Sequence, residues 1–156
     1  MNTANLTIQQ VLNGALSLNG NDKKYIITVE GNKIITSVKW MDATFFAPSL
    51  VTNEMREFKF VATLNNDNTW NELDETETVQ KTAGLGGVAM SKSTFKGKTI
   101  RYSKTIAFGQ KNGDEKLGIV ECTFSTQEYK KPVSEYLTAC GYRKAKKGFF
   151  ATLFGR

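Results

Sequence analysis

Apolar residues recur at two different spacings along this chain, and the spacing near the N-terminus is that of a helix. Between residues 6 and 18 the apolar positions return every three or four residues. Asn5 or Thr7 stands where an N-cap belongs, and Gly20 follows the last apolar position. The pattern predicts a short amphipathic helix over residues 6–18.

The next two pairs of segments alternate with the period of two that is typical of strands. Residues 25–29 and 34–40 are rich in β-branched and aromatic side chains and flank a short polar turn, so they predict a first hairpin. Residues 58–64 alternate in the same way and end in the polar turn 65–68. Because Trp70 begins another apolar segment, these residues predict a second hairpin.

Two segments near these strands lack a regular pattern. Residues 41–53 contain an Ala-Pro-Ser sequence, which favours an irregular loop with the aromatic stretch 44–48 inside it. Residues 81–93 include the glycine-rich stretch 83–87, where the high backbone entropy of glycine disfavours regular structure. We therefore expect a loop at 41–53 and a mobile loop at 81–93.

A third hairpin is predicted around Asn112-Gly113, a pair that favours the positive φ angles of a type I′ turn. Apolar residues that share one strand face occur on both sides of this pair. They are Ile100, Tyr102, Ile106 and Phe108 before it, and Val120, Cys122 and Phe124 after it.

The last periodic segment is helical. Pro132 suits a first helical turn, apolar residues then follow at i, i+3, i+4 and i+7 up to Cys140, and Gly141 suits the position after a helix end. These features predict an amphipathic helix over residues 132–140 that packs on the sheet.

Together these elements predict one α+β domain spanning residues 1–156. An antiparallel sheet of about six strands is built from three hairpins, and the N-terminal and C-terminal helices pack against it. A small, partly open β-barrel capped by the C-terminal helix is the alternative. A chain of 156 residues buries roughly 70% of its surface on folding, so it needs no disulfide or metal to fold.

The N-terminus and the cysteines bear on the compartment. No cationic segment followed by an apolar stretch opens the chain, and no run approaches the roughly 18 apolar residues of a transmembrane segment. The two cysteines, Cys122 and Cys140, are expected to be free, reduced and buried. These features favour an intracellular, cytoplasmic protein.

Several kinds of chemistry are excluded or disfavoured by the residue types present. The chain has no histidine, so catalysis by Ser-His-Asp or Cys-His groups is absent, and two cysteines cannot form a four-cysteine zinc site. Gly97-Lys98-Thr99 resembles the end of a phosphate-binding loop, but Lys92 occupies the position where that motif requires glycine. We expect no enzymatic activity, no cofactor and no metal.

Charge is distributed unevenly along the chain. Residues 1–128 balance basic and acidic residues, whereas residues 129–156 hold seven basic residues against Glu135 alone, and so carry the whole net charge of +6. The acidic residues that cluster near the second hairpin are interpreted as a solvated strand edge: Glu72, Asp74, Glu75 and Glu77.

The basic residues continue into a basic and aromatic C-terminal tail at 143–156. The candidate binding residues are Lys130, Lys131, Arg143, Lys144, Lys146, Lys147, Phe149 and Phe150. Cations beside aromatic rings attract nucleic-acid phosphates or an anionic membrane surface. The alternative for the tail is that its aromatic residues fold back onto the core.

Two functions remain open from the sequence. The first is a non-catalytic binding module that presents the aromatic stretch 44–48, or the face beside it, to a protein partner or small ligand. The second is binding of nucleic acid or an anionic membrane surface through the basic tail. The sequence contains no motif that decides between them.

Overall fold

The computed structural model describes residues 6–97, 102–112 and 116–145, and over these ranges the chain is mainly β. A single mixed sheet contains all the strands, and two α-helices and a 3₁₀ turn accompany it. In chain order the elements are α1 (Ile8–Ala15), the 3₁₀ turn η1 (Leu16–Leu18), β1 (Ile26–Glu30), β2 (Lys33–Ala47), β3 (Leu50–Leu64), β4 (Thr69–Gly84), β5 (Gly87–Gly97), β6 (Tyr102–Lys111), β7 (Gly118–Ser125), α2 (Thr126–Ala139) and β8 (Arg143–Lys144).

The sheet has eight strands in the described ranges, with the main order β5-β4-β3-β2-β6-β7. β1 pairs with β2, and the short β8 pairs with β4 as the parallel member of an otherwise antiparallel sheet. The sheet is open, because β5 and β7 end this order without pairing to each other. The α+β class agrees with the prediction, but the expectation of about six strands is wrong.

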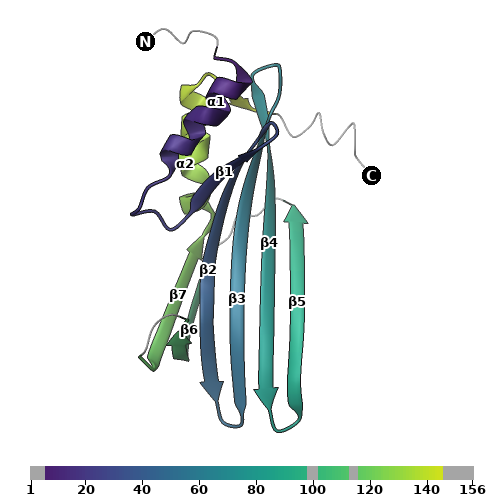
Figure 1. Cartoon of the computed structure of the whole chain (residues 1–156), viewed down its shortest axis with the longest axis vertical. Coiled ribbons are helices and arrows are strands. Elements are labelled where there is room, and N and C mark those ends of the chain that lie inside the picture. Colours follow the sequence, from purple (N-terminus) through teal and green to yellow (C-terminus); the bar gives the residue numbers. More distant parts are fainter. Residues whose placement is uncertain (1–5, 98–101, 113–115, 146–156) are drawn as a thin grey trace.

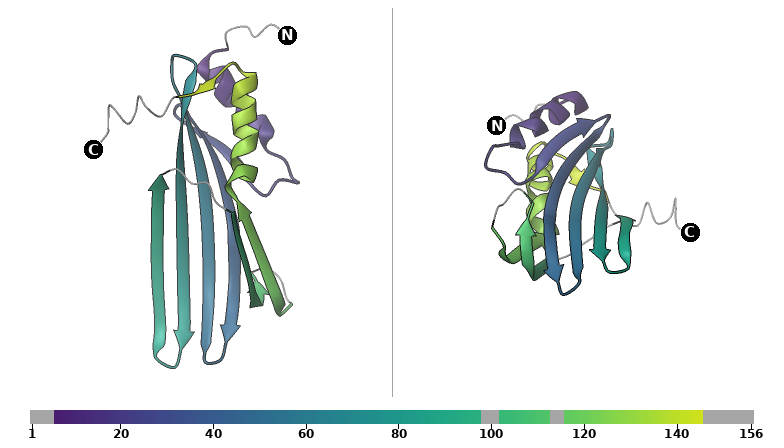
Figure 2. Two further views of the ribbon diagram at one scale, coloured as in Figure 1. Left: turned by 180° about the vertical axis from the view of Figure 1, so that it is seen from behind. Right: turned by 60° about the horizontal axis from the view of Figure 1, so that its bottom comes forward.

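The two helices cover only one end of the long sheet. Figure 1 shows α1 and α2 beside the upper part of β2 and β3, while the lower parts of β2 to β5 extend well beyond them. The two further views in Figure 2 show the same arrangement from behind and from below. The molecule therefore has a helix-covered end and a helix-free end.

α1 forms where the sequence pattern predicts it. Thr7 is the N-cap, and its hydroxyl accepts a hydrogen bond from the backbone N–H of Gln10, whose side chain accepts one from the Thr7 N–H in return. The helix buries Val11, Leu12 and Ala15 against the sheet. Local capping and apolar spacing thus agree with the tertiary contacts.

The first two predicted hairpins are confirmed. β1 and β2 pair around a turn in which Gly31 has a φ of 60°. β3 and β4 pair from Leu64 and Trp70 onward, and Asn68 in their turn has a φ of 60°. Both turns carry residues that tolerate the left-handed region.

The loops predicted at 41–53 and 81–93 are wrong. Residues of 41–53 belong to β2 and β3, which pair as far as Ala47 and Leu50, so that only a tight turn separates them. Residues of 81–93 belong to β4 and β5, which pair as far as Gly84 and Gly87. Strand pairing over the whole length of β3 outweighs the weak local propensities of both segments.

The third hairpin is confirmed, but its tight turn is not. The pairing of β6 with β7 ends at Gly109 and Gly118, so Asn112 is not part of a two-residue turn between them. Instead the end of β6 pairs with β2, where Lys111 lies opposite Ala43. Gly113 lies outside the described residues, and so does Ile100 on the preceding side.

α2 begins at Thr126, six positions earlier than the sequence predicts, and Pro132 lies inside it. Tertiary packing supports the extra turns, because the Tyr129 ring stacks on Phe124 with centroids 5.9 Å apart. Val133 and Leu137 are fully buried, which confirms that this helix packs on the sheet. The early start also places Lys130 on the buried side of the helix.

The main core lies between the helix-covered end of the sheet and the two helices. Its most enclosed side chains from the sheet include Ile34, Phe58 and Phe60, and the aromatic rings of β3, β4 and β7 contact one another across it. A smaller apolar cluster lies nearer the helix-free end and joins β2 to β7. Its buried members are Met41, Ala43, Val120 and Cys122.

Candidate binding surfaces

Strand register decides which side chains share a face of the sheet, because residues directly opposite each other in an antiparallel pair point the same way. On the face that carries the helices, Phe60 of β3 lies opposite Asp74 of β4. On the other face, Lys59 lies opposite Glu75, which lies opposite Lys96 of β5. The four acidic residues of β4 are therefore divided between the two faces.

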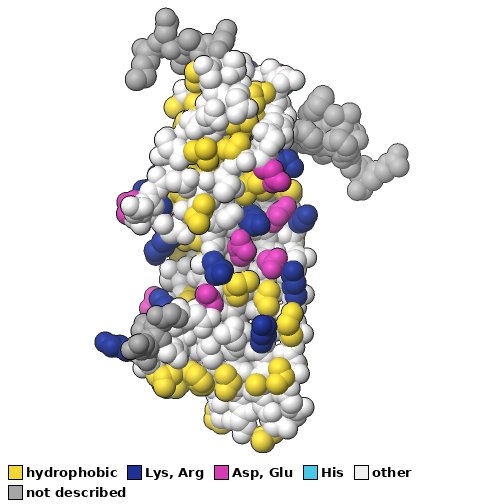
Figure 3. All heavy atoms as spheres, in the orientation of Figure 1, with side chains coloured by type: hydrophobic (Ala, Val, Ile, Leu, Met, Phe, Trp, Pro, Cys, Tyr) yellow, Lys and Arg dark blue, Asp and Glu magenta, His cyan; other side chains and the backbone are white. Residues whose placement is uncertain are grey.

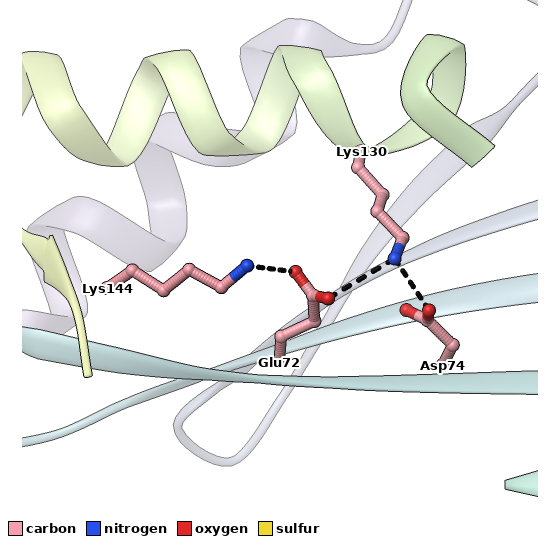
Figure 4. Close-up of polar contacts among 4 residues, drawn as sticks. All are labelled: Glu72, Asp74, Lys130 and Lys144. Atoms are coloured by element: carbon pink, nitrogen blue, oxygen red, sulfur yellow. Dashed lines mark hydrogen bonds and ion pairs between the residues drawn. The ribbon is translucent and has the colours of Figure 1, made fainter. Parts of the chain in front are cut away.

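Glu72 and Asp74 lie on the helix side and form the ionic network in Figure 4. The Lys130 ammonium donates to Asp74 Oδ2 at 2.6 Å and to Glu72 Oε1 at 3.2 Å. Lys144 donates to the second Glu72 oxygen at 2.7 Å. Asp74 is fully buried, and the side chain of Lys130 is only 9% exposed. The interpretation of Glu72 and Asp74 as a solvated edge is wrong.

The network changes the ionisation of Glu72. Burial alone raises the pKa of a carboxyl group, but the hydrogen bond from Lys144 and the charges of Lys130 and Lys144 together outweigh burial. The pKa of Glu72 is therefore lowered, and its side chain stays ionised beneath α2. Two basic residues that the sequence assigns to a binding surface are thus engaged in neutralising buried acids.

The structure describes only some of the other candidate tail residues. Lys131 is exposed on α2 and pairs with Glu135 at 3.7 Å, and Arg143 is exposed on β8. Lys130, Lys131 and Lys144 line one shallow cavity of about 210 Å³ between α2 and β4, together with Trp70. The other four candidates lie outside the described residues: Lys146, Lys147, Phe149 and Phe150.

The helix-free end carries a different surface on the face away from the helices. One row of apolar residues crosses six strands there, linked pair by pair through the register. Phe108 lies opposite Ile119, the Phe46 and Phe108 rings are 6.4 Å apart, and Phe46 lies opposite Val51. The row, which we call the apolar band, consists of Ile119, Phe108, Phe46, Val51, Ala83 and Val88.

The members of the apolar band are exposed in the described structure, with Ile119 at 72% and Val88 at 82%. In Figure 3 the band is seen as a line of yellow side chains across the lower part of the sheet. The turn between β4 and β5 extends the apolar surface, because Leu85 at its tip is 95% exposed. Exposed apolar patches of this extent are uncommon on monomeric proteins and mark interaction sites.

Charged side chains lie above the band on the same face. Lys92 pairs with Glu77 at 3.6 Å, and Lys96 pairs with Glu75 at 3.7 Å across β4 and β5. Figure 3 shows dark blue and magenta side chains interspersed near the middle of the sheet, above the yellow line. Pairs of this kind are solvated and contribute little to stability, but they separate the apolar band from the rest of the face.

A third surface is a cleft of about 420 Å³ where β7 diverges from the upper part of β2. Trp40, Lys111 and Glu121 are among its lining residues, and Cys122 contributes to its wall. Burial raises the pKa of the Cys122 thiol, which agrees with the expected unreactive, free cysteine. Cys140 is also free but only partly buried, so the expectation of two buried thiols holds for Cys122 alone.

Neither a metal-binding cluster nor a membrane-spanning helix occurs in the described ranges. These ranges contain no cluster of three or more acidic or cysteine side chains placed to hold a metal ion. Within the same ranges, no helix has the length and apolar content needed to cross a membrane. Comparison with protein-family models, with curated proteins and with solved structures finds no match to this chain.

Proposed function

We propose that this chain is a non-catalytic binding module and that its binding surface is the apolar band at the helix-free end. The observation that carries the proposal is the continuity of the band, which crosses six strands with its side chains exposed. Apolar area removed from water contributes roughly 25 cal/mol per Å², so a partner that covers the band gains a large favourable term.

Phe46 from the aromatic stretch 44–48 lies within this surface, whereas Phe45 packs against the smaller apolar cluster on the other face. Phe46 occupies the middle of the band, between Phe108 on one side and Val51 on the other. A rigid sheet holds these side chains in fixed positions before any partner arrives, which lowers the entropic cost of binding. A protein or small-ligand partner was the sequence-based hypothesis for this stretch, and the band offers such a partner a continuous exposed apolar row.

The alternative, binding of nucleic acid or an anionic membrane surface through the basic C-terminal tail, has less support from the described residues. Lys130 is buried and Lys144 bridges to Glu72, so neither is a freely solvated cation. Lys131 and Arg143 remain exposed. Within the described residues these two cations neutralise few phosphates, and phosphate neutralisation dominates non-specific affinity for nucleic acid; Lys146 and Lys147 lie outside the described residues.

A photo-cross-linking experiment with a matched control tests the proposal. A diazirine amino acid replaces Ile119 in the band or Ile26 on β1; both are exposed strand isoleucines, at 72% and 64%. After irradiation in the cells that produce the protein, adducts to protein or lipid are quantified. We expect several-fold more adduct from position 119. Equal yields at the two positions contradict a binding role for the band.

A further inference from the structure

The apolar surface at the helix-free end continues around the hairpin tips onto the helix-side face. Val51 points to the outer face, whereas its neighbour Leu50 lies opposite Ala47 and points to the other face. Leu50 is 43% exposed, and Leu85 projects from the adjacent tip. A protein partner with a flat surface contacts one face of the sheet, whereas the fluid interior of a lipid layer can surround both faces of a hairpin tip.

Two lysines lie close to the apolar band on the β4–β5 hairpin. Lys81 lies two residues from Ala83 of the band, and Lys92 lies four residues from Val88. At about 3.3 Å per residue, these lysines stand roughly 7 and 13 Å from the band. Interfacial protein segments bury their apolar side chains about 5–10 Å into the boundary between headgroups and acyl chains, so both ammonium groups fall at headgroup level.

Carboxylates at this end of the described structure are held by neighbouring side chains. Glu54 accepts from Arg56 at 2.6 Å, and Glu121 pairs with Lys104 at 3.2 Å. Lys111 adds a further exposed cation near the β6–β7 end, while Asp114 and Glu115 lie outside the described residues. Asp42 accepts a hydrogen bond from Asn112, and Lys92 pairs with Glu77, so the positive charge beside the β4–β5 tip that no ion pair in the described ranges engages is that of Lys81. This charge is complementary to an anionic surface.

We infer that the helix-free end docks on an anionic lipid surface, with the tips of β2–β3 and β4–β5 in the interface and Lys81 and Lys92 at the headgroups. This inference rests on the proposed function, because it names the partner of the same surface. We expect the docked sheet to stay in the interfacial region of the lipid layer. β5 is an edge strand, and its outward N–H and C=O groups would lose their hydrogen bonds to water in the hydrocarbon region.

Vesicle co-sedimentation tests the inference directly. The full chain is mixed with 100-nm vesicles of phosphatidylcholine alone or with 30% phosphatidylserine, and the bound fraction is measured against lipid concentration. We expect clear binding to the anionic vesicles and weaker binding to the neutral ones. Each lysine near an anionic surface contributes about 1 kcal/mol, or about fivefold, and the pairing of Lys92 with Glu77 reduces its share, so K81Q/K92Q should weaken binding by about 5- to 25-fold.

Two further variants separate the contributions. L85S/V88S removes two exposed apolar side chains from the tip and should weaken binding to anionic vesicles by at least about tenfold. K23Q/K33Q removes the same charge from exposed positions away from the helix-free end and should leave binding within about twofold. Because all six positions are exposed, the thermal midpoint of each variant should match that of the parent chain.

The outcomes distinguish the lipid inference from the proposed function. Equal binding by the parent chain and by K81Q/K92Q, or no binding to anionic vesicles, overturns the lipid inference. If the chain instead sediments as a dimer that L85S/V88S dissociates, the band joins two copies, and the proposed binding surface stands without lipid. If vesicle binding is absent and cross-linking at Ile119 equals that at Ile26, both conclusions fall.

Discussion

Replacing Lys130 by methionine tests whether the network beneath α2 is structural. Lys130→Met keeps the length of the aliphatic stem but removes the charge that lies 2.6 Å from the fully buried Asp74. Breaking a buried ion pair by removing one partner costs about 3–5 kcal/mol, because the remaining charge is left in a poor solvent. We therefore expect a loss of about 3–5 kcal/mol in the free energy of unfolding.

The size of this loss makes it easy to measure. In a chain of this length, 1 kcal/mol shifts the thermal midpoint by about 2–4 °C, so Lys130→Met should lower the midpoint by roughly 6–20 °C. Urea unfolding gives the free energy independently, provided that the m-value does not change. The matched control is Lys131→Met on the same helix, whose side chain is 71% exposed and should change stability by less than about 0.5 kcal/mol.

A double variant separates buried charge from lost packing. In Lys130→Met/Asp74→Asn a neutral amide replaces the buried carboxylate, so no uncompensated charge remains and the double variant should be more stable than Lys130→Met alone. If Lys130→Met costs less than about 1 kcal/mol, or if the second change destabilises the chain further, the network does not support the fold in the way that its geometry indicates.

Three smaller predictions concern titration, backbone contact and thiol access. Because the pKa of Glu72 is lowered in the folded state, its ionised carboxylate contributes fully to the free energy of unfolding above the ordinary pKa of 4.5, and this contribution is lost as the pH falls through the folded pKa. Glu72→Gln should therefore make the free energy of unfolding, measured by urea titration, depend less on pH between pH 6 and 3. A Cβ on Gly109 would lie 2.1 Å from a β2 carbonyl oxygen, so Gly109→Ala should cost more than about 2 kcal/mol, whereas Gly118→Ala, with nothing within 4 Å, should be neutral or slightly stabilising by thermal melting. A thiol reagent should modify Cys140 faster than the buried Cys122 in the native protein, and mass spectrometry of the labelled peptides distinguishes the two sites.

The parts of the fold that sequence patterns predict are those fixed by local chemistry. The Thr7 cap, the turn at Gly31 and the polar turn before Trp70 each depend on residues within a few positions of one another. The pairing of Ala43 with Lys111 depends instead on the end of β6 meeting β2 across a long stretch of chain. No local pattern specifies such a contact, so the joining of the third hairpin to β2 was not predicted.

Glycine and proline misled the sequence interpretation for a physical reason. The stretch 83–87 forms a turn of Leu85 and Gly86 with strands on both sides, because pairing with β3 and β4 compensates for the backbone entropy of its glycines. Likewise, Pro48 occupies a tight turn at the end of β2 rather than the middle of a loop. Because both segments were assigned to loops, the strand register that aligns Phe46, Val51 and Ala83 could not be predicted.

The acidic residues of β4 show a signal that was present in the sequence. Glu72 and Asp74 have the same parity as Trp70, an apolar residue that opens the strand, whereas Glu75 and Glu77 have the opposite parity. A period of two therefore places the first pair on the core side of the sheet and the second pair on the other. What the pattern omits is the cation that compensates them, because Lys130 arrives from a helix that starts earlier than Pro132 indicates.

The main core and the proposed binding surface occupy opposite ends of this sheet. The helix-covered end buries Phe58, Phe60 and Leu137 and holds the ionic network, so changes there act on folding. The larger side chains of the apolar band remain partly in water, from 37% exposed for Phe46 to 82% for Val88, so they bury less apolar area in the folded monomer than the core residues do. Since exposed β-branched or aromatic residues can be replaced by polar ones at little cost in stability, a row of such residues across six strands is best explained by what it contacts outside the chain.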